Sequence, residues 1–222
     1  MLVIASNLKM CYKNTSKLRR KFSGMLGGNF PSNNIVSCMH ISELILSEKT
    51  VSFELETDLL MALENLSDSL QKFKNGREGY LKWSIIFGHT ALQSAMCLSL
   101  ITAGNFLVRK KDSYDQDSGD LDNVEWLYQK LQKPEFLPFI GSKTIPEVGG
   151  ELNQVKRLQI VRNTFIHQQP DLYLFTSEEL CELIELTIKL TRFLVSKSER
   201  MVLGIINKEA LEAQLELVEN HS

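Results

Sequence analysis

The sequence predicts an all-α protein, an antiparallel bundle of helices. From residue 41 onward, apolar side chains recur at three- and four-residue steps, the period of a helix that buries one face. No stretch alternates apolar and polar residues between turn signals, as a half-buried strand would. Of the 222 residues, 43% are hydrophobic and 23% are charged, and the formal net charge is −2. This composition is typical of a soluble globular protein and argues against a wholesale polyelectrolyte binder.

Two long helices are predicted first along the chain. Apolar residues at helical spacing predict a helix over 52–74, which Asn75-Gly76 ends. The next helix, over 78–108, is long and apolar enough to span a bilayer. Its scattered His, Gln, Asn, Ser and Thr residues instead favour a central helix that packs on several sides, and no membrane association is expected. Trp83 in this helix and Trp126 after it are expected in the core rather than on a base-stacking surface.

A charged loop over 109–122 separates these helices from the second half of the chain. Asp122 or Asn123 is placed to cap a short helix that ends at Leu131. Three prolines then interrupt the chain, at positions 134, 138 and 146.

Three more helices are expected after the prolines. One runs over 147–168 and stops before Pro170. Thr176 and Glu179 have capping-box spacing and open the next helix. Asn207 is placed to cap the last one, whose apolar face is formed by Leu211, Leu215 and Val218.

The N-terminal region differs from the rest of the chain in its charge. Residues 1–42 carry six Lys and Arg residues, and the first acidic residue is Glu43. We therefore expect a basic, poorly structured N-terminal extension over 1–40, followed by a helical domain over 41–222. Three interpretations stay open: an organelle transit peptide, a disordered arm that contacts nucleic acid, or a start-site artefact with Met39 as the true start.

The cysteines and histidines predict neither a disulfide framework nor a metal site. The four cysteines are scattered and include no Cys-x-x-Cys pair, which favours free thiols in a reducing compartment. His40 lies near Cys38, but no further residue joins them at ligand spacing. Neither a P-loop nor a nucleophile elbow is present. No metal and no cofactor are expected.

One arginine occupies an unexpected position on the helix over 147–168. A step of about 100° per residue places Arg162 in the middle of the apolar arc of this helix. A guanidinium cannot escape burial by losing its proton, so it needs a partner or a wet cavity. Either Glu78 or Glu185 could supply a salt bridge, which is the structural alternative to a functional role.

Two neighbours of Arg162 place further polar side chains at the end of this helix. Asn163 and His167 are four residues apart and share the edge beside the apolar arc. Arginine suits the charge of a phosphate, histidine suits proton transfer, and a carboxamide can orient a substrate. Together the three side chains indicate a phosphodiester substrate.

The segment from Arg162 to His167, Arg-Asn-Thr-Phe-Ile-His, resembles the Arg-polar-x-x-x-His signature of the HEPN (higher eukaryotes and prokaryotes nucleotide-binding) superfamily. The segment from Trp83 to Gln93 resembles the first core helix of that family. The resemblance covers roughly 52–200 and leaves out the N-terminal extension. It implies an HEPN-like antiparallel helical bundle with the motif on a late helix.

The resemblance also implies a function. Many members are metal-independent endoribonucleases of toxin or antiviral-defence type, in which the 2′-hydroxyl of RNA attacks the adjacent phosphate and leaves a 2′,3′-cyclic phosphate. Arg162 and His167 would then be catalytic and Asn163 supporting, with two motifs facing each other across a homodimer. An antitoxin or defence partner protein and a cytoplasmic location are expected. Control by nucleotide addition to a Tyr two residues after the His is not expected, because Gln169 stands there.

Other residues are candidates for substrate binding. His89 and Gln93 lie one turn apart on the central helix and could line the cleft or simply bond within the bundle. Arg109, Lys110 and Lys111 could contact RNA phosphates or form a solvated loop. The alternative function is a catalytically inactive HEPN-like module that binds RNA or protein and dimerises.

Overall fold

The computed structural model describes residues 54–101, 106–111, 120–146, 150–167, 173–197 and 208–222. These contain the helices α3 (Leu55–Lys74), α4 (Tyr80–Leu100), α5 (Val124–Leu131), α6 (Glu151–His167), α7 (Ser177–Lys197) and α8 (Lys208–His221), with 3₁₀ turns η1 (Phe106–Val108) and η3 (Leu137–Ile140). In these ranges the only β-type pairing is an isolated bridge between Arg109 and Leu121. The all-α prediction is confirmed. The expected extension over 1–40 and the expected cap Asn207 lie outside the described residues.

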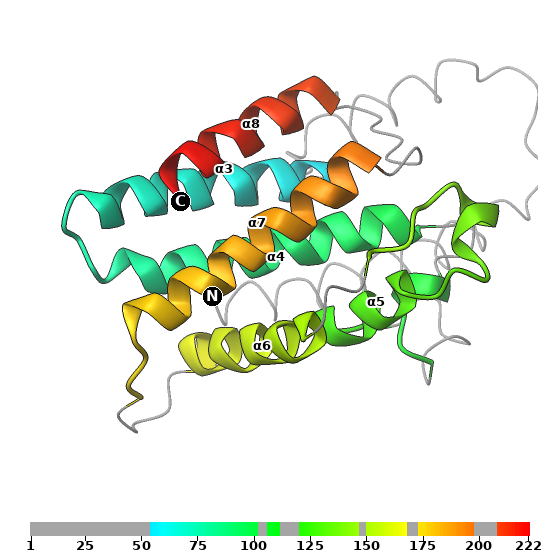
Figure 1. Ribbon diagram of the computed structural model, residues 1–222, viewed down its shortest axis with the longest axis horizontal. Helices are drawn as coiled ribbons and strands as arrows, with labels where there is room; N and C mark the ends of the chain where they lie inside the picture. The colour runs from blue at the N-terminus through cyan, green and yellow to red at the C-terminus, as the bar shows by residue number, and fades with distance from the viewer. Residues whose placement is uncertain (1–53, 102–105, 112–119, 147–149, 168–172, 198–207) are drawn as a thin grey trace, which may run out of the picture. The chain divides into compact units, whose positions relative to one another are not determined.

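The central helix of the bundle is α4. It packs against α3, α5, α6 and α7, and Figure 1 shows it between them. Ile85, Leu92 and Met96 of this helix are 0% exposed. The expectation of a central helix packed on several sides is therefore confirmed. Within the described ranges, no helix has both the length and the apolar character that crossing a membrane requires.

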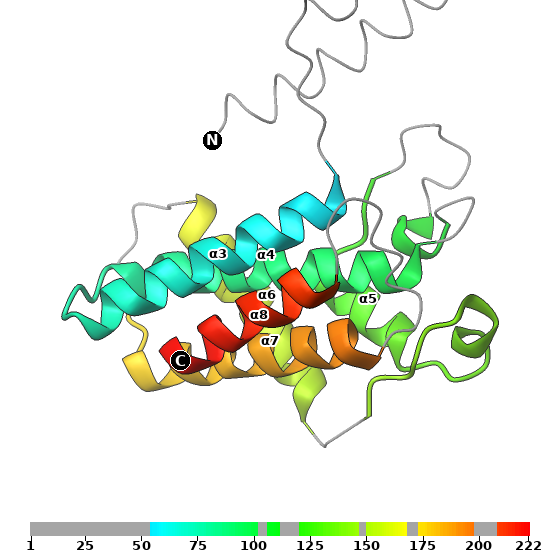
Figure 2. The same cartoon turned by 90° about the horizontal axis from the view of Figure 1, so that it is seen from above.

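A tight turn joins α3 to α4 and makes them antiparallel neighbours. The backbone N–H of Asn75 donates to Gln71 O at 3.1 Å, and Gly76 adopts a positive φ of 81°. A residue with a side chain rarely adopts this conformation, so Asn75-Gly76 ends the helix as the sequence predicts. Helix α8 then covers α3 and α7 (Figure 2).

Helices α4 and α7 approach closely at a glycine. A Cβ atom at Gly88 would lie 3.3 Å from Cγ2 of Thr187, and Thr187 is 1% exposed. A larger residue at position 88 would therefore crowd the facing helix. The small residue at this position lets the two helix backbones approach each other within the buried core.

The predicted range of the second helix, 78–108, was too long. The helix ends at Leu100, because Ile101 has an extended backbone with ψ of 133°. Apolar residues continue through Leu107 and Val108, but they belong to the separate turn η1. Hydrophobic content could not mark this end, because the residues of η1 are as apolar as those of the helix.

The two ends of the charged loop meet beside α5. Lys130 donates to the main-chain oxygens of Leu107 at 2.8 Å and Arg109 at 3.2 Å, and it also pairs with the buried carboxylate of Asp122. Asn123 caps α5, accepting from the backbone N–H of Trp126 at 3.0 Å. The predicted cap and the predicted end at Leu131 are both confirmed.

Neither tryptophan lies in the core, contrary to expectation. Trp83 is 41% exposed and Trp126 is 53% exposed. Both residues lie outside the buried core of their helices, which in α5 consists of Val124, Leu127, Tyr128 and Leu131. Residue type alone could not reveal this, since large aromatics are often only partly buried.

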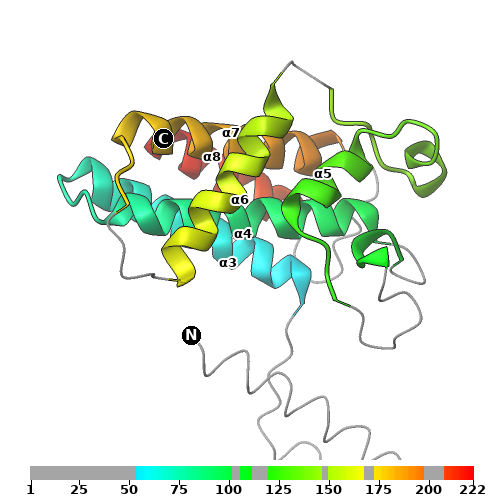
Figure 3. The same ribbon diagram turned by 90° about the horizontal axis from the view of Figure 1, so that it is seen from below.

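Helix α6 carries the motif and crosses the bundle obliquely. It contacts α4, α5 and α7, and Figure 3 shows it running across α4. Val155, Leu158 and Val161 form its fully buried seam. The predicted range 147–168 agrees with the observed helix within a few residues at each end.

Candidate functional site

The start of α6 is fixed by a buried carboxylate. Glu151 is 5% exposed and accepts hydrogen bonds from Tyr128 Oη at 3.0 Å and Lys189 Nζ at 2.7 Å. A buried carboxylate needs such partners, and here they come from α5 and α7. Their positions fix α6 along its axis, and thereby the position of its last turn.

Arg162 is half-buried on α6, and no described carboxylate neutralises its charge. Its Nη1 donates to Oδ1 of Asn163 at 3.0 Å, while its buried Nε has no hydrogen-bond partner among the described residues. Neither Glu78 nor Glu185, the expected alternatives, forms an ion pair with it in the described part of the chain. Burial lowers the pKa of this guanidinium from its usual value. The group still carries its charge at neutral pH, so it is suited to an anion from outside the protomer.

A chain of hydrogen bonds leads from Arg162 into the core. Nε2 of Gln159 donates to the same Asn163 Oδ1 at 3.1 Å. The Oε1 of Gln159 lies 3.0 Å from Nε2 of His89 on α4. Because a carboxamide oxygen can only accept, the hydrogen of His89 must lie on Nε2.

His89 is neutral in this environment. It is 1% exposed, and its pKa falls from 6.5 to about 4, chiefly because burial disfavours the imidazolium and further because of the charge of Arg162. The hydrogen bond that His89 donates to Gln159 raises the pKa, but burial outweighs it. With the hydrogen on Nε2, Nδ1 is a bare acceptor, and no group in the described part of the chain donates to it. His89, predicted as a possible substrate-binding residue, therefore lies in the core beneath Arg162 and Asn163 and not at the surface.

His167 is the last residue of α6 and is exposed. Within the described residues it forms no hydrogen bond and no ion pair. Five residues turn an α-helix by about 140° beyond one full turn, so Arg162 and His167 leave α6 in different directions. Thus the structure brings Arg162 and Asn163 together, while His167, on the same face of α6 as Asn163, leaves the helix in a different direction from Arg162.

The other predicted substrate-binding residues lie elsewhere. Gln93 donates to the main-chain oxygen of Asp122 at 3.1 Å and so holds the base of the charged loop. In the same loop, Lys110 pairs with Asp120 at 3.3 Å, and Lys111 is exposed.

These basic residues follow the C-terminal end of α4, whereas the last turn of α6 lies near its N-terminal end. Phe165 in that turn has Lys82 Nζ 5.9 Å from its ring centroid. The structure therefore separates Arg109, Lys110 and Lys111 from the Arg162 site.

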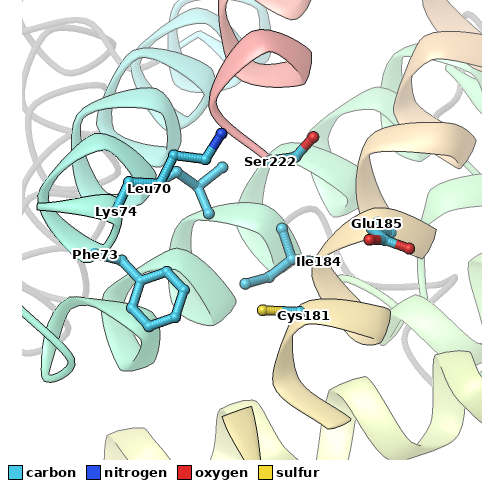
Figure 4. A pocket seen from close by; sticks show the side chains of 7 residues that line it. All are labelled: Leu70, Phe73, Lys74, Cys181, Ile184, Glu185 and Ser222. Carbon is cyan, nitrogen blue, oxygen red and sulfur yellow. The ribbon is translucent and has the colours of Figure 1, made fainter. Parts of the chain in front are cut away.

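A small pocket lies away from the motif. Figure 4 shows its lining side chains, which come from the end of α3, the first half of α7 and the last residue of the chain. Its volume is about 160 Å³, and none of the predicted site residues lines it. Cys181, one of the lining residues, has a raised pKa because of burial and the charge of Glu185, which makes its thiol a weak nucleophile.

The described residues hold no cluster of metal-binding side chains. No three His, Cys, Asp or Glu side chains gather there in an arrangement that could hold an ion. The cysteines described, Cys97 and Cys181, are free.

Gln159 and Lys82 are the neighbours of the site that sequence reasoning missed. Gln159 lies four residues before Asn163, which is a signal for contact on one helix face. Nothing in the sequence indicates its bond to His89, 70 residues away. The sequence did not indicate Lys82 either, because its contact with Phe165 depends on how α4 and α6 cross.

Comparisons with protein-family models, with curated proteins and with solved structures found no match for this chain.

Proposed function

We propose that this chain is a metal-independent endoribonuclease that acts as a homodimer, with Arg162 and His167 as catalytic residues and Asn163 supporting them. The observation that carries the proposal is the half-buried guanidinium of Arg162, which no carboxylate among the described residues neutralises. Arginine stays charged, so a partly buried site of this kind favours a bound anion. A phosphodiester has the required charge and geometry.

In the proposed reaction, every bond change and proton transfer is accounted for without a metal ion. A base removes the proton of the 2′-hydroxyl, the 2′-oxygen bonds to phosphorus, and the bond to the 5′-oxygen breaks. The leaving oxygen takes up a proton, and the products are a 2′,3′-cyclic phosphate and a 5′-hydroxyl. His167 transfers a proton, and Arg162 stabilises the charge that develops on the phosphate.

A homodimer accounts for the separation of these two residues. His167 shares its face of α6 with Asn163 and with Ile160, because seven residues make almost two full turns. Ile160 is 55% exposed, an apolar side chain left open to solvent on the face that carries His167. A second protomer docked on this face would cover Ile160 and bring a second His167 towards the first motif.

The alternative is a catalytically inactive module that binds RNA or a protein partner and dimerises. The separation of His167 from Arg162 within one protomer favours this alternative. The role in a toxin or antiviral-defence system, the cytoplasmic location and the antitoxin or defence partner rest on the motif resemblance alone.

Cleavage of total RNA in EDTA, with analysis of the new ends, tests the proposal. We expect the full chain to cut RNA and leave cyclic phosphate ends. Arg162→Ala and His167→Ala should each lower the rate by about 100-fold or more. Arg157→Ala and His221→Ala are matched controls, because these residues form structural contacts with Glu179 and Ser67.

Two results would contradict the nuclease. One is RNA that stays intact with the unsubstituted chain, and the other is cutting that survives both catalytic substitutions. RNA binding without cutting would support the inactive module.

A further inference from the structure

The carboxamide of Asn163 is held from both sides. Its Oδ1 accepts from Nη1 of Arg162 at 3.0 Å and from Nε2 of Gln159 at 3.1 Å. A carboxamide oxygen has two lone pairs, and both are used here. The orientation of the amide is therefore determined, and its nitrogen is left to donate elsewhere.

Gln159 can make this bond in only one orientation. Its nitrogen must face Asn163, which requires its oxygen to face His89. In this orientation the Gln159 oxygen accepts the hydrogen on Nε2 of His89, so a His89 fixed as that tautomer stabilises it. A turned Gln159 would set two amide oxygens against each other and leave two donors, on His89 and Gln159, facing each other.

His89 is well placed to hold Gln159 in this orientation. It belongs to the central helix, is 1% exposed and stays fixed by the surrounding core. Its low pKa keeps it neutral, so it presents a single N–H rather than two.

We infer that His89 and Gln159 are positioning residues that hold Asn163 and Arg162 in the arrangement that receives the phosphate. The chain runs from His89 through Gln159 to the Asn163 oxygen, on which the Arg162 guanidinium also bonds. The Asn163 nitrogen, which donates to no group in the described ranges, then faces a phosphate oxygen. This inference rests on the proposed function, since it describes how the same site is held in place.

Substitutions that keep or remove the hydrogen-bond donor test the inference. His89→Gln retains an N–H near the position of Nε2, whereas His89→Leu removes it. Gln159→Met breaks the same chain at a half-buried position and serves as a second variant if His89→Leu fails to fold. Ser99→Ala is the control, because this buried hydroxyl bonds only within its own helix, to Ala95 O at 2.9 Å.

The kinetic constants separate positioning from simple stability. With the folded fraction measured by urea unfolding, His89→Leu and Gln159→Met should lower kcat by about 10- to 100-fold and change KM less. His89→Gln should stay within about threefold of the original kcat, because its amide replaces the donor. Unchanged kcat in both His89→Leu and Gln159→Met would overturn the inference.

A second readout does not depend on activity. Nitrogen-15 NMR should show His89 as the neutral tautomer protonated at Nε2. The side-chain signals of Asn163 and Arg162 should shift in His89→Leu and stay in place in His89→Gln.

This readout keeps the two proposals distinguishable. If the chain cuts no RNA, the proposed function fails, and the NMR signals still decide the positioning role. Asn163 and Arg162 signals that stay in place in His89→Leu would overturn it.

Discussion

Burial distinguishes the two histidines near the proposed site. His89 lies in the core with its Nε2 hydrogen bonded to Gln159, whereas His167 is exposed at the end of α6. The first is held as a neutral donor, and the second lies at the surface, where a substrate could reach it. The same residue type thus serves positioning at one site and, in the proposed mechanism, catalysis at the other.

The depressed pKa of His89 predicts a loss of stability in acid. The unfolded chain takes up a proton near pH 6.5, but folded His89 does so only near pH 4. Stability from this group is therefore complete above pH 6.5 and is lost as the pH falls towards 4, by up to about 3 kcal/mol. Urea unfolding at pH 7.5 and 4.5 measures this loss. His89→Gln, which does not titrate, should lose less stability over the same range, and equal losses would contradict the prediction.

At the scale of elements, side-chain caps mark where two of the described helices, α5 and α7, begin. Asn123 accepts from Trp126 N at the start of α5, and Thr176 accepts from Glu179 N at 3.1 Å at the start of α7. Each cap satisfies a backbone N–H that lacks a partner inside its helix. These starts were predictable because the bond joins residues three apart in the sequence. The end of α4 was not, because no side chain marks it.

Removing the cap of α7 should weaken the fold. Thr176→Ala deletes the acceptor for Glu179 N and should lower the free energy of unfolding by about 1 kcal/mol. Thr176→Ser keeps the hydroxyl and should restore most of the stability. Ser177→Ala, at the adjacent exposed position, is the control and should change little. Urea unfolding of the four proteins gives the comparison, and equal stability of Thr176→Ala and the original chain would refute the role of the cap.

At the scale of the whole molecule, the bundle leaves the proposed site incomplete. The loop with Arg109 to Lys111 follows one end of α4, while Phe165 and the last turn of α6 lie near the other. One protomer therefore does not gather its basic residues around one phosphate. The exposed face of α6 with Ile160, Asn163 and His167 is where a second protomer could complete the site.

The proposed homodimer predicts the effect of a charge on this face. Ile160→Glu buries a carboxylate in the interface, so it should shift the protein to monomer and abolish RNA cleavage. Leu217→Glu on α8 is the matched control, because Leu217 is 48% exposed on another helix. Sedimentation velocity at the assay concentration measures the oligomeric state. Active monomers, or an Ile160→Glu variant that stays dimeric and active, would refute the homodimer cleft.

Local patterns in the sequence determined the helices, their caps and the partial burial of Arg162. Each of these depends on residues within a turn or two of one another, so periodicity and cap spacing suffice to predict them. The tertiary structure decided which side chains contact one another across the bundle and which face outward. Gln159 meets His89 across 70 residues, and Trp83 turns outward, because both depend on how α4 is rotated and crossed by its neighbours. Rotation and crossing follow from packing of the whole core, which no short stretch of sequence encodes.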